Sequence, residues 1–129
     1  MMKLNFRSLA ILSALLFFAL ALTWMFAPDL VLSSWGVELS YPVGLVGRRA
    51  AALYAGVGVM FFLARNTEPS AARSALITGF MVSCLVLAAL GVFELATGHA
   101  ERGILAAVLI EVAFVLAFLC VARTRKTNH

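Results

Sequence analysis

The chain has 129 residues, of which 64% are hydrophobic and only 12% are charged, and its net charge is +4. A soluble globular domain is close to half apolar and a quarter charged. This composition therefore excludes a soluble enzyme and predicts one domain in a lipid bilayer. In a membrane protein, a net positive charge usually reflects the orientation of the chain in the bilayer and its contact with anionic lipid headgroups. No Lys/Arg cluster is interleaved with aromatic residues, which excludes nucleic-acid binding.

The first apolar segment, residues 8–27, is 20 residues long and uncharged, and it follows the basic residues Lys3 and Arg7. Its length matches one helix through a hydrocarbon core about 30 Å thick. A cleaved signal peptide is the alternative, because Ala19-Leu20-Ala21 resembles a cleavage site after a basic start. The apolar run continues past that site to Phe26, which favours an uncleaved span.

Pro28 ends this span, and the segment up to Gly36 predicts a short helix at the membrane surface. Both tryptophans and one of the two tyrosines fall near this end of the span, namely Trp24, Trp35 and Tyr41. Such a grouping is typical of the aromatic belt at a membrane interface.

Three more spans are predicted, at about 43–64, 74–96 and 103–122. The uncharged part of the second, residues 50–64, is too short to cross alone, so Arg48 and Arg49 must lie within the hydrocarbon or at its edge. The fold class is therefore an all-α membrane protein, a four-helix transmembrane bundle in a single domain.

An even number of spans places both termini on one side of the membrane. With the termini inside, the inner segments hold seven Lys or Arg residues and the outer segments hold three. The inner residues are Lys3, Arg7, Arg65, Arg73, Arg123, Arg125 and Lys126, and the outer ones are Arg48, Arg49 and Arg102. The positive-inside rule therefore predicts cytoplasmic termini.

Four charged residues share the outer half of the predicted bilayer, on three different spans: Arg48, Arg49, Glu94 and Glu111. A lone charge at the centre of a membrane helix costs about 3 kcal/mol on insertion scales, so such groups usually face the bundle interior and pair. We expect Arg48 or Arg49 to pair with Glu111, and with Glu94 as a further partner, while the other arginine extends to the lipid headgroups.

Two interpretations of this buried charge cluster remain open. In the first, the ion pair is structural and sets the register of the helices. In the second, the cluster is a functional site, with a glutamate that takes up protons or an arginine that holds an anionic headgroup or a quinone-like ligand. Glu111 is the better functional candidate of the two glutamates, because it lies deeper in its span.

Small residues in the second span are spaced four apart, in the rows Gly47, Ala51, Ala55 and Ala52, Gly56. Rows of this kind let helix backbones approach closely. They predict tight packing within the bundle, or equally the contact surface of a homo-oligomer.

Nothing in the chain predicts catalysis, a metal site or a cofactor. His99 has no second histidine near it, and neither Cys84 nor Cys120 belongs to a paired-cysteine motif. No nucleophile lies beside a candidate base. We therefore expect a protein that is not an enzyme.

The layout has four recognisable features: Pro28 after the first span, Trp35-Gly36 in the loop, the 47–51 stretch GRRAA that opens the second span, and a basic loop before the third. With these it resembles small bacterial four-span membrane proteins of unknown function, DoxX-like and related families. The resemblance implies a bacterial inner membrane. Some DoxX-like members are linked to quinone or thiol redox systems, but this chain lacks their paired cysteines.

Small multidrug transporters also have four short spans, but their functional carboxylate is in the first span, where this chain has no acid. The leading prediction is a structural or accessory protein that contacts lipid, another membrane protein or a second copy of itself. The alternative is a small proton-coupled transporter or lipophilic-ligand binder that uses Glu111, Arg48 and Arg49.

Overall fold

The computed structural model describes residues 5–127, with side chains up to Ala122. Lys3 and the side chains of Arg123, Arg125 and Lys126, which the topology prediction counted, lie outside the described residues. The described part is helical, with the elements α1 (Phe6–Phe26), α2 (Pro28–Ser34), α3 (Tyr41–Ala64), α4 (Ala71–Ala96) and α5 (Ile104–Thr127). All but α2 are long and apolar enough to cross a membrane. The predicted all-α, four-span fold is confirmed.

Side-chain caps decide where three of the long helices begin. The residues that precede them accept a hydrogen bond from a backbone N–H of the first turn, and they are Asn5, Ser40 and Ser70. Pro28 begins α2, because its missing N–H costs nothing in a first turn. Gly36 and Gly98 follow α2 and α4 with positive φ angles of 74° and 82°, which end these helices in a conformation that glycine adopts without strain.

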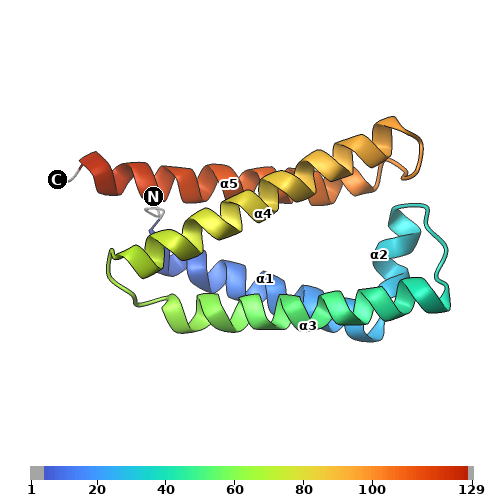
Figure 1. Cartoon of the computed structure of the whole chain (residues 1–129), viewed down its shortest axis with the longest axis horizontal. Helices are drawn as coiled ribbons and strands as arrows, with labels where there is room; N and C mark the ends of the chain where they lie inside the picture. Colours follow the sequence, from blue (N-terminus) through green and yellow to red (C-terminus); the bar gives the residue numbers. More distant parts are fainter. Residues whose placement is uncertain (1–4, 128–129) are drawn as a thin grey trace.

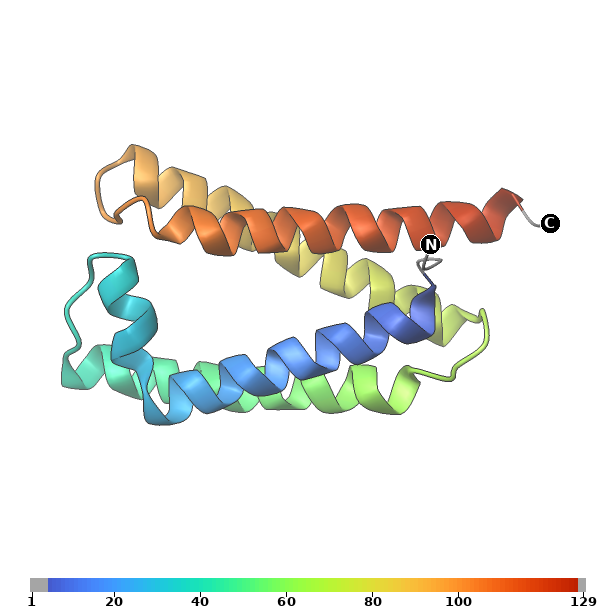
Figure 2. The ribbon, with the colours of Figure 1, turned by 180° about the vertical axis from the view of Figure 1, so that it is seen from behind.

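The four long helices form two antiparallel pairs, α1 with α3 and α4 with α5 (Figure 1). Both termini lie at one end of the molecule, and α2 lies across the other end. Seen from behind in Figure 2, α4 runs diagonally, close to α1 at the terminal end and farther from it at the α2 end. We call these units the α1–α3 pair and the α4–α5 pair.

Phenylalanine rings join the two pairs near the terminal end. Each long helix contributes at least one ring to this cluster: Phe6, Phe61, Phe80, Phe114 and Phe118. The ring centroids of Phe61 and Phe80 are 4.9 Å apart, and those of Phe80 and Phe118 are 5.3 Å apart. Lipid is as apolar as these rings, so the cluster stabilises the fold through close packing and edge-to-face geometry.

Glycines allow the close approach of α1 and α3. A Cβ atom at Gly47 would lie 2.9 Å from Cε3 of Trp24, and one at Gly58 would lie 2.9 Å from Cε1 of Phe18. Of the predicted small-residue rows, Gly47 and Ala51 are buried and Ala55 is half-buried. The other row, Ala52 and Gly56, is exposed, and a Cβ at Gly56 would meet nothing within 4 Å.

The aromatic residues near α2 differ from a simple belt. Trp24 is buried, with its ring centroid 5.7 Å from that of Trp35, whereas Tyr41 is exposed. The reason is Gly47, which leaves space beside α3 that the Trp24 ring occupies. Trp24 therefore packs inside the bundle.

Two polar contacts connect segments that are distant in sequence. At the α2 end, the Glu101 N–H donates to the Trp35 carbonyl at 2.8 Å, and Gly103 lies directly against the Ser34 carbonyl. At the terminal end, Nε of Arg7 donates to Oδ1 of Asn66 at 2.9 Å. The α2 segment thus contacts the α4–α5 loop at one end, and the phenylalanine cluster joins the two helix pairs toward the other end. The candidate site lies between these contacts.

Candidate functional site

The four charged residues predicted to cluster do not meet. Arg48 and Arg49, in the first half of α3, are exposed, and neither forms an ion pair with Glu94 or Glu111. Glu94 contacts His99 instead, with 3.1 Å between Oε2 and Nδ1. The predicted pairing of Glu111 with Arg48 or Arg49 is wrong.

Helix pairing explains this difference. The arginines belong to α3, which packs on α1, whereas Glu111 belongs to α5, which packs on α4. The Arg48 side chain runs back along α3, so that its Nη1 would be 3.6 Å from a Cβ at Gly44. This direction leads to the helix start at the α2 end, and long basic side chains in membrane helices commonly extend in this way to the interface.

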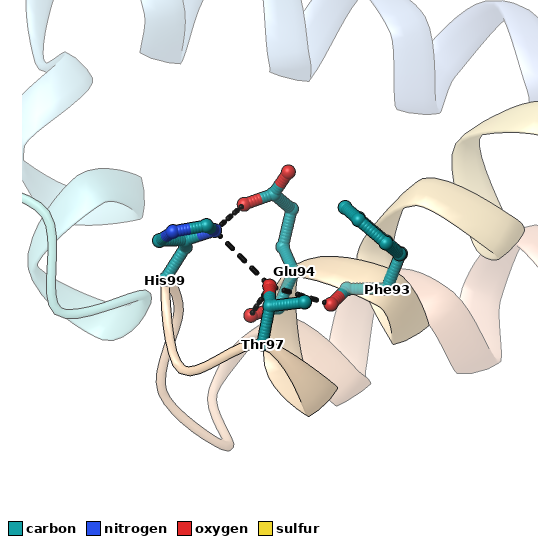
Figure 3. Close-up of polar contacts among 4 residues, drawn as sticks. All are labelled: Phe93, Glu94, Thr97 and His99. Atoms are coloured by element: carbon teal, nitrogen blue, oxygen red, sulfur yellow. Dashed lines mark hydrogen bonds and ion pairs between the residues drawn. The ribbon is translucent and has the colours of Figure 1, made fainter.

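Glu94 is part of a polar network at the end of α4 (Figure 3). The Thr97 hydroxyl donates to the Phe93 carbonyl at 2.8 Å and lies 3.0 Å from Nδ1 of His99. The side chains of His99 and Glu94 are 69% and 41% exposed. An exposed pair of this kind contributes little to stability. We interpret this network as the polar end of a helix.

Glu111 lies in a different environment, between the two helix pairs. One carboxylate oxygen, Oε2, is buried and has no hydrogen-bond partner. The residue lines a cavity of about 120 Å³, which we call the small cavity. All four long helices contribute to its wall, which is formed by Leu16, Phe17, Leu20, Tyr54, Phe80, Cys84, Leu87, Ala107, Ile110, Glu111 and Phe114.

A second space, the large cavity, measures about 380 Å³ and is lined mainly by α3 and α4. Five residues line both cavities, so the two spaces are neighbours: Phe17, Tyr54, Phe80, Cys84 and Leu87. Leu53 and Met60 of α3 line the large cavity and are also exposed on the molecular surface. The large cavity is therefore accessible from the lipid-facing side.

Helical spacing brings these residues to one place. On α4, Phe80, Cys84 and Leu87 are four and three positions apart, and on α5 the same spacing relates Ala107, Glu111 and Phe114. Residues at this spacing share one helix face. The faces of α4 and α5 that carry Cys84 and Glu111 thus border the same small cavity.

The lining is apolar and aromatic, with few polar groups. Besides Glu111 these are Tyr54, Cys84 and Ser83, and the Ser83 hydroxyl already donates to the Gly79 carbonyl at 3.0 Å. Among the described lining residues there is no Lys, Arg or His. A concave apolar site with a few polar groups is the usual form of a small-molecule site.

The described residues contain no group of three or more His, Cys, Asp or Glu side chains that could hold a metal ion. The sequence prediction found Glu111 but missed Tyr54 and the aromatic residues around it. The available signal was the position of Tyr54, the tyrosine in the middle of a span rather than at the interface.

Chemically, the site offers an acid, a phenol and a thiol at the junction of two apolar spaces. This arrangement can bind an apolar molecule that carries one polar group. Comparison of the chain with protein-family models, with curated proteins and with solved structures finds no match.

Proposed function

We propose that this small multi-pass membrane protein binds a lipophilic small molecule in the two adjoining cavities, with Glu111 as the group that orients it. The observation that supports this most strongly is the buried Oε2 of Glu111 without a partner, in the wall of an apolar cavity. Buried polar atoms nearly always have a partner, and one that lacks it marks a place where a ligand can supply the hydrogen bond.

The competing function is a structural or accessory role, in which lipid chains merely fill the space between the helices. One support for that role was an ion pair that holds the helices in register, and this pair is not formed. An unpaired acid facing a cavity contributes no register contact. Ligand binding is therefore the better supported function.

The direct test is saturable binding of a neutral lipophilic probe, tritiated 1-naphthylmethanol, to the protein in phosphatidylcholine nanodiscs. Gly79→Leu should abolish this binding, because Gly79 lines the large cavity and a Cβ there would meet nothing within 4 Å. The new side chain then occupies ligand space without disturbing the helices.

Gly56→Leu is the matched control. Gly56 has the same open surroundings but lines neither of the two cavities. This variant should bind the probe like the wild type. Equal binding by both variants would contradict the proposal, as would absence of saturable wild-type binding both of this alcohol and of the charged analogues with the same ring system.

We further propose that the protein resides in a bacterial inner membrane with both termini in the cytoplasm. The support is the excess of Lys and Arg in the segments on the same side of the predicted bundle as the termini, seven against three on the other side. The likeness of layout to DoxX-like proteins points the same way.

A further inference from the structure

We infer that the ligand of the two cavities is a lipophilic cation, an amine or ammonium group attached to an apolar body. This inference rests on the proposed function and specifies its ligand class. It is carried by the charge of the cavity wall, by the aromatic rings next to Glu111 and by the position of the chain's own cations.

The charge of the wall is unbalanced. Glu111 is the acid that lines the small cavity, and none of the described residues lining either cavity is basic. A carboxylate in apolar surroundings is costly unless it is paired and hydrogen-bonded. A ligand ammonium supplies both the opposite charge and the N–H donor that Oε2 lacks. A ligand anion would instead add repulsion.

Aromatic rings next to Glu111 favour the same ligand. Phe17, Tyr54 and Phe80 line both cavities, and the Phe17 centroid is 5.7 Å from that of Tyr54 and 5.4 Å from that of Phe80. Ring faces attract a cation through their quadrupole, most strongly where water is excluded. A neutral alcohol could donate a hydrogen bond to Oε2, but the aromatic rings would add little to its binding free energy.

The basic side chains that the structure describes lie away from the two cavities. Arg48 and Arg49 are exposed near the α2 end. At the terminal end, the guanidinium of Arg73 lies 4.1 Å from the centroid of the Phe6 ring and donates to the Thr67 carbonyl at 3.2 Å. The place of a cation beside Glu111 is therefore open to a ligand, and the exposed wall of the large cavity faces the bilayer in which a lipophilic amine accumulates.

The experiment compares three probes that share one ring system: 1-naphthylmethylamine, 1-naphthylmethanol and 1-naphthoate. Binding is measured in nanodiscs of phosphatidylcholine, a lipid without net charge. The amount of probe that partitions into protein-free nanodiscs is subtracted. Wild type should bind the amine about tenfold or more tightly than the alcohol, and the carboxylate most weakly.

Glu111→Gln should remove the preference, lowering affinity for the amine about tenfold while affinity for the alcohol stays the same. Glu94→Gln is the matched control and should keep the preference, because Glu94 lines neither cavity. Phe17→Leu keeps the acid and should lower the affinity for the amine more than the affinity for the alcohol. This second variant keeps the test decisive even if Glu111→Gln fails to fold.

Equal affinity of wild type for amine and alcohol, or a preference that survives in Glu111→Gln, would overturn the assignment of a cation and leave the proposed function intact. Failure of all three probes to bind wild type saturably would overturn the proposed function itself.

Discussion

Replacement of Glu111 by glutamine tests whether this acid stabilises the fold. Breaking a buried ion pair by removing one partner costs about 3–5 kcal/mol, because the other charge is left buried alone. Glu111 has no such partner, and its Oε2 accepts no hydrogen bond that the variant would lose. Glutamine has nearly the same shape and carries no charge to desolvate. We therefore expect the free energy of unfolding to increase, by less than about 1 kcal/mol.

The assay is reversible unfolding in mixed micelles of mild detergent and dodecyl sulfate, followed by far-UV circular dichroism. Arg48→Gln and Arg49→Gln serve as controls, because both residues are exposed and should change stability by less than about 0.5 kcal/mol. A loss of about 3 kcal/mol in Glu111→Gln, recovered in a double variant with either arginine change, would refute the reasoning, since it would reveal a buried pair.

Three further predictions concern the fold and its orientation. Gly103→Ala should destabilise the protein by about 1–3 kcal/mol in the same assay, because the new methyl would collide with the Ser34 carbonyl. The control Gly56→Ala should change the stability little. Equal stability of the two variants would contradict the contact between α2 and the α4–α5 loop. Phe118→Ala should cost about 2–3 kcal/mol, at or below the usual range of about 3–5 kcal/mol for a buried phenylalanine, because lipid weakens the transfer contribution. The control Phe93→Ala should cost less than about 1 kcal/mol, because the Phe118 and Phe93 side chains are 0% and 57% exposed; similar losses would contradict the ring cluster. Alkaline phosphatase fused after residue 129 should be inactive and a fluorescent protein fused there should be bright, as expected for a cytoplasmic terminus; the reverse pattern would contradict the predicted orientation.

The spans could be predicted from the sequence because their limits depend on local chemistry. Charged loops and Pro28 interrupt the apolar runs, and the predicted second span, 43–64, ends at the same residue as α3. Its start differs by two residues, because Ser40 caps the helix and Pro42 is tolerated in its first turn. Cap geometry of this kind moves a boundary without changing the fold.

The candidate site could be predicted only in part, because an apolar span does not encode which neighbour it packs against. The sequence places Arg48 and Glu111 in the same half of the bilayer, but a shared half does not determine which helices are neighbours when every helix face is apolar. The pairing of α1 with α3 depends on shape, namely the fit of the Trp24 ring beside Gly47. The same pairing separates the arginines from Glu111 and brings Tyr54 to the cavity wall instead.

The most direct test of a ligand site between the helix pairs is photo-crosslinking with a lipophilic amine that carries a diazirine, followed by peptide mass spectrometry. A rival site exists in the more open apolar groove between α1 and α3, which has a volume of about 520 Å³ and is lined by residues such as Phe18, Met25 and Ala52. We expect labels on residues of the two cavities, Tyr54 and Cys84 among them, and loss of these labels when unlabelled amine competes. Labels confined to the groove, or labels that competition does not reduce, would contradict a ligand site between the helix pairs.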